Sequence, residues 1–211
     1  MSPHTPEEQN LDQNQNNEAP QKVSKPKAQS TFWKDTFQLV FIIVFVVIPF
    51  RVFIAQPFIV SGSSMQPGFQ DRDYLIVDQL TYRFNEPERG DVVIFRYPNN
   101  NKVFYIKRII GLPGDTVIIQ DEQVYIEPAN STERIKIEEP YIDSFRPENS
   151  RTALMDDQYY VMGDNRLVSS DSRVWGPLDR EFITGRAFFR LFPFNKIDAF
   201  PEDYKLYSNS L

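Results

Sequence analysis

The chain has 211 residues, the length of one ordinary domain with an appendage, and its formal net charge of −6 argues against nucleic acid as a main partner, because phosphate binding needs clustered cations. It contains no cysteine, which excludes disulfides, thiolate nucleophiles and zinc–sulfur sites. The one histidine is His4, in a polar N-terminal stretch, so a Ser-His-Asp triad or a histidine-ligated metal is a poor interpretation.

The N-terminal part divides into a polar stretch and an apolar run. Residues 1–31 are rich in Asn, Gln, Pro, Lys and Glu, and we expect a disordered tail. Residues 37–55 are apolar at all but three positions. At 1.5 Å per helical residue, such a run spans roughly 28 Å, about one hydrocarbon core. Residues 32–55 are therefore predicted to form one transmembrane helix, with a buried core helix or a membrane-surface helix as the alternatives.

The lysines flanking this run indicate its orientation. Lys22, Lys25, Lys27 and Lys34 lie on its N-terminal side, and cations next to a span stay in the cytoplasm. We therefore expect a cytoplasmic N-terminus, and residues 56–211 as an extracytoplasmic domain. No second apolar run of that length follows, so the predicted anchor is single-pass.

The rest of the chain is predicted to be mostly β structure. Short runs rich in Val, Ile, Tyr and Phe are separated by Gly, Pro, Asn and Asp, and none has a long helical period. The predicted strands are Tyr74–Val77, Val92–Tyr97, Val103–Ile110, Thr116–Ile119, Gln123–Ile126, Tyr159–Met162 and Arg186–Phe192. Residues from about 120 to 157 are more polar, and we interpret them as a small inserted β region or edge hairpin rather than core.

A serine cluster follows the apolar run directly. Ser64 ends the sequence Ser61-Gly62-Ser63-Ser64 and is the candidate nucleophile. A serine hydroxyl attacks only when a base removes its proton. Without a usable histidine, that base is a lysine, a carboxylate or a terminal amine. The alternative interpretation of the cluster is an ordinary polar loop.

Lys107 is the candidate base. Alternation along a strand places Lys107 on one face with Val103, Tyr105 and Ile109, and Arg108 on the other. Burial among apolar neighbours would lower the pKa of the lysine until its amine acts as a base near neutral pH, and Arg108 would act in the same direction if it lay close. The alternative is an edge-strand lysine that discourages aggregation.

The stretch from Gly163 to Gly176 is dense in short polar groups. Asp171 with Arg173, or Asp164 with Arg166, would form charge-assisted pairs that make the loop rigid. A serine of this stretch would also be able to hydrogen-bond a neutral lysine amine and orient it. The alternative is a solvated turn.

Together with Arg89–Phe95, these stretches resemble the bacterial type I signal peptidase (leader peptidase) family. The similar segments occur in family order behind an N-terminal anchor and cover about residues 57–192. They are Ser63–Pro67, Arg89–Phe95, Tyr105–Asp115 and Gly163–Gly176.

The resemblance implies a role for each matched residue. Ser64 would be the acylated nucleophile and Lys107 the general base. Ser169 matches the serine that orients the lysine, and Asp171 and Arg173 match a supporting ion pair. The implied fold is a signal-peptidase-like β catalytic domain, and no metal or cofactor is implied.

The resemblance also implies the substrate and the cellular setting. Phe58, Val60 and Ile106 match positions that line an apolar cleft, where signal peptides of exported preproteins bind as an extended strand and are cut after small-X-small sequences. The expected partners are these preproteins and a lipid bilayer, with a monomeric enzyme in the plasma membrane and a thylakoid membrane as the alternative location.

Two positions depart from the family pattern. Gly62 stands where many relatives have a serine whose hydroxyl helps to stabilise the oxyanion, so the backbone N–H of Ser64 becomes the main expected donor. Gly68 replaces the usual threonine after Pro67. The remaining alternatives are another Ser-Lys protease, acting on inner organellar membrane proteins or on itself, and a non-catalytic anchored β domain that binds peptides or assembly partners.

Overall fold

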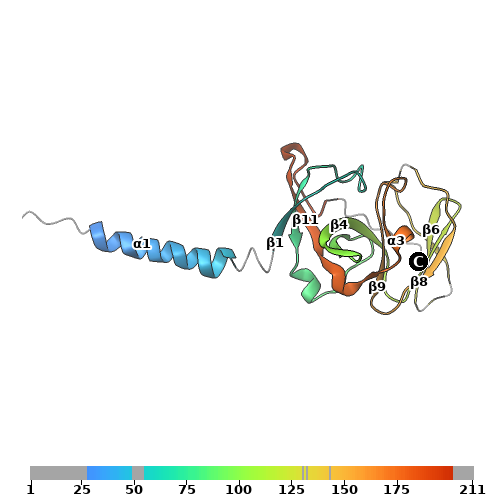
Figure 1. Ribbon diagram of the computed structural model, residues 1–211, viewed down its shortest axis with the longest axis horizontal. Helices are drawn as coiled ribbons and strands as arrows, with labels where there is room; N and C mark the ends of the chain where they lie inside the picture. The colour runs from blue at the N-terminus through green and yellow to red at the C-terminus, as the bar shows by residue number, and fades with distance from the viewer. Residues whose placement is uncertain (1–27, 49–54, 130, 132, 143, 202–211) are drawn as a thin grey trace, which may run out of the picture. The chain divides into compact units, whose positions relative to one another are not determined.

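The computed structural model describes residues 28–48, 55–129, 131, 133–142 and 144–201 (Figure 1). The chain divides into two compact units, one that ends at Ile42 and one that begins at Ile43. Each unit is described by itself.

The first unit contains helix α1, Ala28–Ile42, which starts inside the stretch expected to be a disordered tail. Its described side chains are largely apolar and almost all of them are exposed, Trp33 and Phe37 among them. The second unit begins with the π-helical segment η1, Ile43–Val47.

The predicted transmembrane helix over 32–55 falls only partly on described residues, and its predicted end at Ala55 is wrong. Within the residues that the structure describes, no helix is both long enough and apolar enough to cross a membrane. The α-helical hydrogen bonding ends at Ile42, and Ala55 is already paired with Asp78 in a β-sheet. Residues 1–27 and 49–54, on which the tail and the rest of the predicted span fall, lie outside the described part of the chain.

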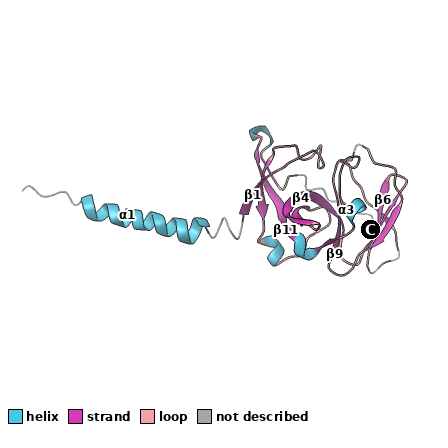
Figure 2. Ribbon diagram, in the orientation of Figure 1, coloured by secondary structure: helices cyan, strands magenta, loops and turns pink. Residues whose placement is uncertain are grey.

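An eight-stranded antiparallel sheet is the larger of the two sheets in the described part of the second unit. Figure 2 draws the strands in magenta. Its strands run in the order β1-β2-β11-β3-β4-β9-β10, with β12 paired to β11. The strands are β1 (Ala55–Ile59), β2 (Tyr74–Asp78), β3 (Val92–Tyr97), β4 (Asn100–Gly111), β9 (Gln158–Met162), β10 (Leu178–Asp179), β11 (Ile183–Phe192) and β12 (Asp198–Ala199).

A second, four-stranded sheet fills the predicted insertion, with strand order β7-β6-β5-β8. Its strands are β5 (Thr116–Gln120), β6 (Gln123–Glu127), β7 (Ile135–Lys136) and β8 (Ser150–Ala153). The sheet starts at Thr116, earlier than expected. Val117, Val124 and Ile137 of this region lie in a buried cluster that also includes Ile110 of β4 and Met162 of β9. The polar composition of the region did not indicate this core.

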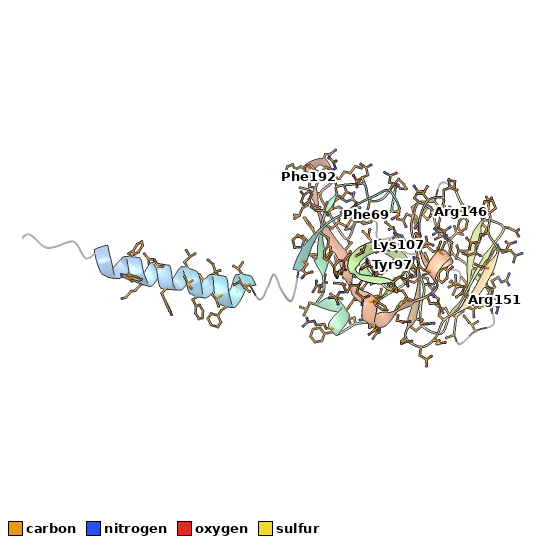
Figure 3. All side chains as sticks on the ribbon, in the orientation of Figure 1. Phe69, Tyr97, Lys107, Arg146, Arg151 and Phe192 are labelled. Carbon is orange, nitrogen blue, oxygen red and sulfur yellow. The ribbon has the colours of Figure 1, made fainter. Side chains whose placement is uncertain are left out.

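Short helical turns complete the described chain. They are η2 (Thr81–Arg83), α3 (Ser172–Trp175), η3 (Arg180–Phe182) and η4 (Phe194–Lys196). The mostly β prediction is confirmed, since every predicted run of alternating or apolar residues forms a strand. The long strand β4 is central: it pairs with β3 on one side and β9 on the other, and Lys107 lies in its middle (Figure 3).

Candidate active site

Ser64 lies in the loop that joins β1 to β2. The Val60 N–H donates to the Asp73 carbonyl at 2.9 Å, which closes the base of this loop. Met65 and Phe69 point inward and are almost completely buried in an apolar cluster. Burial of two large side chains, each worth roughly 1.5–3 kcal/mol, anchors the turn while Ser64 itself stays half-buried.

Two backbone N–H groups of the serine loop differ in whether they are already hydrogen-bonded. Gly62 adopts a φ of 95°, which glycine tolerates, and its N–H donates to the Asp71 carboxylate at 2.8 Å. The Ser64 N–H makes no hydrogen bond to any described residue. Ser64 can therefore offer its N–H to an oxyanion, whereas the Gly62 N–H is already engaged.

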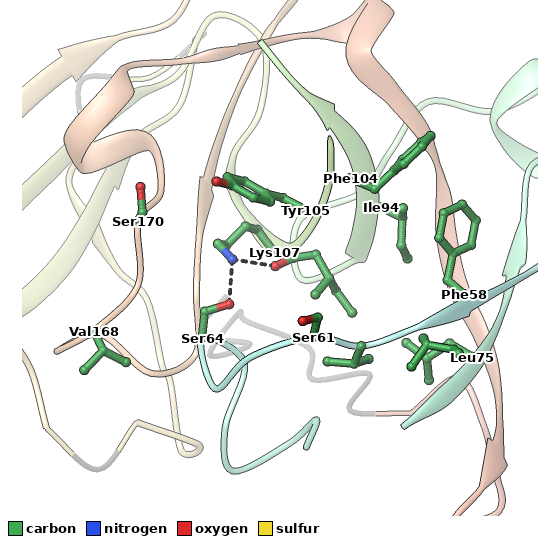
Figure 4. Close-up of a pocket in the computed structure, with 13 residues that line it drawn as sticks. Phe58, Ser61, Ser64, Leu75, Ile94, Phe104, Tyr105, Lys107, Val168 and Ser170 are labelled. Atoms are coloured by element: carbon green, nitrogen blue, oxygen red, sulfur yellow. Dashed lines mark hydrogen bonds between the residues drawn. The ribbon is translucent and has the colours of Figure 1, made fainter. Parts of the chain in front are cut away.

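Lys107 is brought to Ser64 by strand β4. Its side chain is 3% exposed. Its Nζ lies 2.7 Å from Ser64 Oγ and donates to the Ile106 carbonyl at 2.8 Å (Figure 4). A neutral amine has two N–H bonds and one lone pair, so donation to Ile106 leaves the lone pair free to face the Ser64 hydroxyl.

Burial lowers the pKa of Lys107 to about 8, because desolvation disfavours the ammonium form. Asp171 and Asp164 act in the opposite direction, since their negative charges favour the ammonium. Arg108 was expected to lower the pKa of Lys107 as well, and it is not among the groups that do so. Its guanidinium binds Asp164 instead, donating from Nε at 2.9 Å and from Nη2 at 2.7 Å.

Asp171 and Arg173 form the predicted ion pair. The Arg173 guanidinium donates to both Asp171 oxygens at 2.8 Å, and both side chains are almost completely buried. Asp171 also caps α3 and accepts the Gly163 N–H at 3.0 Å. Burial acts to raise the pKa of Asp171, but the hydrogen bonds and charge of Arg173 hold it below its usual range. A charged Asp171 thus ties the two ends of this loop together.

Ser169 is close to the site without contacting it in the predicted way. Its hydroxyl is buried and meets the geometric criteria for a hydrogen bond with none of the described residues, but it lies close enough to the Asp171 carboxylate to help lower the pKa of that group. It packs over Gly163, where a Cβ would collide with Ser169 Oγ and lie 2.5 Å from the Ser64 carbonyl oxygen. The Lys107 amine is oriented by the hydrogen bond that it donates to the Ile106 carbonyl. The lysine-orienting role of Ser169 therefore stays a prediction.

The alternative ion pair, Asp164 with Arg166, is wrong. Asp164 pairs with Arg108, and Arg166 pairs with Glu139, which comes from the small-sheet region. Sequence reasoning missed Glu139 because this contact joins segments far apart in the chain. The only signal was the density of polar groups around Asp164.

Sequence reasoning also missed Asn165. Its backbone N–H donates to the Ser64 carbonyl at 3.0 Å, and its side-chain amide donates to the Ser63 carbonyl at 3.3 Å. The loop that begins at Gly163 therefore supports the backbone of the serine turn from behind.

An apolar cleft of about 280 Å³ ends at the Ser64–Lys107 pair. The three predicted cleft residues, Phe58, Val60 and Ile106, all line it. Figure 4 labels Phe58 among the lining residues. Its other lining residues are Ile59, Ser61, Leu75, Ile94, Phe104, Tyr105, Val168 and Ser170. The cleft lies between residues of β1 and β4, which suits an extended peptide that passes over the serine.

A family model and two sequence relatives identify the family of this chain. The family model described as "Signal peptidase, peptidase S26" matches residues 33–192. A probable signal peptidase I-2 from Synechocystis sp. is 36% identical, over 81% of this chain and 78% of that protein. Signal peptidase I from Bacillus licheniformis is 37% identical, over 70% of this chain and 82% of that protein. The crystal structure of a signal peptidase I from Enterococcus faecalis V583 has a TM-score of 0.41 and 28% identity, covering 48% of this chain and 97% of that one.

Proposed function

The chain belongs to the signal peptidase family, peptidase S26, and we propose that it removes signal peptides from exported preproteins with a dyad of Ser64 and Lys107. Its enzyme class is that of a signal peptidase I, a serine protease. The observation that carries the dyad is the 2.7 Å separation of Lys107 Nζ and Ser64 Oγ at the end of an apolar cleft.

The first half of the reaction forms an acyl-enzyme. With a pKa of about 8, roughly a tenth of Lys107 is neutral at about pH 7. The neutral amine takes the Ser64 proton, and Oγ bonds to the scissile carbonyl carbon. The resulting oxyanion accepts a hydrogen bond from the Ser64 N–H. Lys107 then gives its proton to the leaving nitrogen, the C–N bond breaks, and the mature protein departs with a new amino terminus.

The second half of the reaction returns the enzyme to its starting state. Lys107, neutral again, takes a proton from water, whose oxygen attacks the ester carbon. Collapse of the second tetrahedral intermediate breaks the bond to Ser64 Oγ, which regains a proton from Lys107. The signal peptide leaves with a carboxylate, and every step uses only groups of this chain and water.

Several neighbours would keep the dyad in place. The Ile106 carbonyl fixes the amine through its 2.8 Å hydrogen bond. Asp171 and Arg173 hold the adjoining loop through their buried ion pair. Ser169 is proposed as a further positioning residue on the strength of the resemblance and of its buried hydroxyl beside Gly163. Replacing Ser169 by Ala should then lower kcat while the protein stays folded.

We propose that the cleft takes the signal-peptide side of the cleavage site as an extended strand. Phe58 and Phe104 pack edge to face, with ring centroids 5.2 Å apart, and they narrow the space for bound side chains. A narrow apolar space favours small residues on the signal peptide. The matching substrate is a preprotein with a small-X-small sequence before the cut.

Cleavage of a model preprotein tests this function. Wild type should cut after an Ala-X-Ala sequence, with the site read by mass spectrometry, and the folded Ser64→Ala and Lys107→Met variants should not cut. Self-cleavage with no cut in the preprotein would favour the alternative Ser-Lys protease. No cut by wild type would favour a non-catalytic binding domain, and unchanged processing by either folded variant would contradict the dyad.

We also propose that the N-terminal segment holds the enzyme at a membrane. Large apolar side chains from Phe37 to Ile48 are exposed, and water is a poor solvent for such a surface. The flanking lysines support a cytoplasmic N-terminus with residues 56–211 outside, and the proposed location is the plasma membrane, with a thylakoid membrane as the alternative. Alkaline extraction of membranes should leave the full chain in the pellet, and external protease should reach its catalytic domain. Release into the supernatant would contradict this attachment.

A further inference from the structure

The small sheet contacts the active-site loop through a buried ion pair. Glu139 lies between β7 and β8, and its carboxylate accepts two hydrogen bonds from the Arg166 guanidinium, one of them 2.9 Å long from Nη1. The Arg166 side chain is 0% exposed and that of Glu139 is 9% exposed. Arg146, from the same region, donates to the Leu167 carbonyl at 2.7 Å.

Arg166 in turn contacts the loop behind the nucleophile. Its Nε donates to the Gly163 carbonyl at 3.0 Å. The neighbouring residue, Asn165, donates to the Ser64 carbonyl at 3.0 Å and to the Ser63 carbonyl at 3.3 Å. The hydrogen bonds of Arg166 and those of Asn165, joined by the peptide bond between these two residues, therefore connect the small-sheet region to the backbone of the nucleophile.

We infer that Glu139 is a positioning residue: through Arg166 it holds the loop from Gly163 to Arg166 in the conformation that keeps Ser64 against Lys107. This inference rests on the proposed function of Ser64 and Lys107. It also gives the small-sheet region a role in the reaction, since the connection from β7 to β8 supplies the carboxylate.

The geometry favours positioning over simple attachment of the two sheets. Arg166 divides its donors between Glu139 and Gly163, so a shift of the guanidinium moves the loop as well. The backbone of Gly163 is packed tightly against the serine turn, because a Cβ added there would lie 2.5 Å from the Ser64 carbonyl oxygen. A displacement of the nucleophile by about 1 Å can lower a rate by 10²-fold.

The test is Glu139→Gln in the full chain in detergent, with Glu127→Gln as the matched control. Glu127 belongs to the same small sheet and also accepts two hydrogen bonds from an arginine, Arg151, but at an exposed surface (Figure 3 labels Arg151). We expect Glu139→Gln to lower kcat at least tenfold, with KM changed less than twofold. Glu127→Gln should leave both constants unchanged.

Two further readouts and one substitute variant separate positioning from other effects. The midpoint of the pH profile of Glu139→Gln should stay at the wild-type value, because burial of Lys107 is retained. The loss of kcat should exceed any loss of folded protein measured by thermal melting. If Glu139→Gln does not fold, Glu139→Asp is used instead, because aspartate keeps the negative charge on a shorter side chain. The kcat of Glu139→Asp should fall while its KM stays at the wild-type value.

An unchanged kcat in a folded Glu139 variant, or a loss that matches the unfolded fraction, would overturn the inference. The proposed function fails by a different result, namely cleavage by Ser64→Ala at the wild-type rate. An inactive Ser64→Ala with a fully active Glu139→Gln would thus remove only the positioning role.

Discussion

Arg108 and Asp164 form a two-point ion pair in which the arginine side chain is 0% exposed and the aspartate side chain 1% exposed. Arg108 follows Lys107 directly in β4, yet the two cations have different surroundings. The guanidinium is neutralised by Asp164 and lies over the Tyr141 ring at 4.4 Å, whereas the amine of Lys107 faces the Ser64 hydroxyl. One strand thus supplies both a structural charge and a proposed base.

Breaking this pair should destabilise the protein strongly. Arg108→Met leaves the Asp164 carboxylate buried without its partner, which costs about 3–5 kcal/mol in comparable cases. Urea denaturation should show that loss in the free energy of unfolding. Arg151→Met, which breaks the exposed pair with Glu127, should cost less than about 1 kcal/mol. Equal losses in the two variants would contradict the assigned burial.

Lys107 should lower stability at neutral pH. Its pKa falls from 10.5 to about 8 on burial, so at pH values below about 8 the folded state carries a desolvated charge. Lys107→Met should therefore raise the free energy of unfolding by up to about 3 kcal/mol near neutral pH. Above pH 8 the folded state releases this proton before the unfolded state does, so the difference should shrink towards pH 10.5. Denaturation of both proteins across this range provides the measurement, and a constant difference would contradict it.

The width of the cleft should depend on Phe58. Phe58→Ala removes one of the two rings that meet at 5.2 Å and enlarges the apolar space. The preference for Ala over a larger residue on the signal-peptide side should then fall by about tenfold in kcat/KM, since a pocket discriminates side-chain size by roughly that factor. Paired preproteins that differ only at that residue provide the measurement, and an unchanged ratio would place the specificity elsewhere.

Gly163 should tolerate no side chain. Gly163→Ala would push its Cβ against the Ser64 carbonyl and Ser169, so kcat should fall by about 10²-fold. Gly176→Ala is the matched control. A Cβ at Gly176 would meet no atom, but the residue has a φ of 90°, which a side chain disfavours. The substitution should therefore cost about 1 kcal/mol of stability without the loss of kcat. Similar kcat values for the two variants would argue against close packing behind the nucleophile.

The sequence predicted the large strands and the proximity of Ser64 and Lys107 better than it predicted the contacts between the loops. Alternation placed Lys107 in a strand, and its burial followed from apolar neighbours. Strand β1 was missed, because Ala55 continues an apolar run that is also typical of a helix. The partners of Asp164 and Arg166 were wrong for a different reason: a local rule pairs near neighbours, whereas the fold supplies Arg108 and Glu139 from distant segments.

The rate of preprotein cleavage against pH, in wild type and Lys107→Met, tests the central claim most directly. Between about pH 6 and about pH 10, the wild-type kcat should rise with a midpoint at about pH 8, as the amine beside Ser64 loses its proton. Lys107→Met should stay at the uncatalysed background throughout. A wild-type rate that is flat across this range, or a folded Lys107→Met protein that keeps the wild-type rate, would contradict the account.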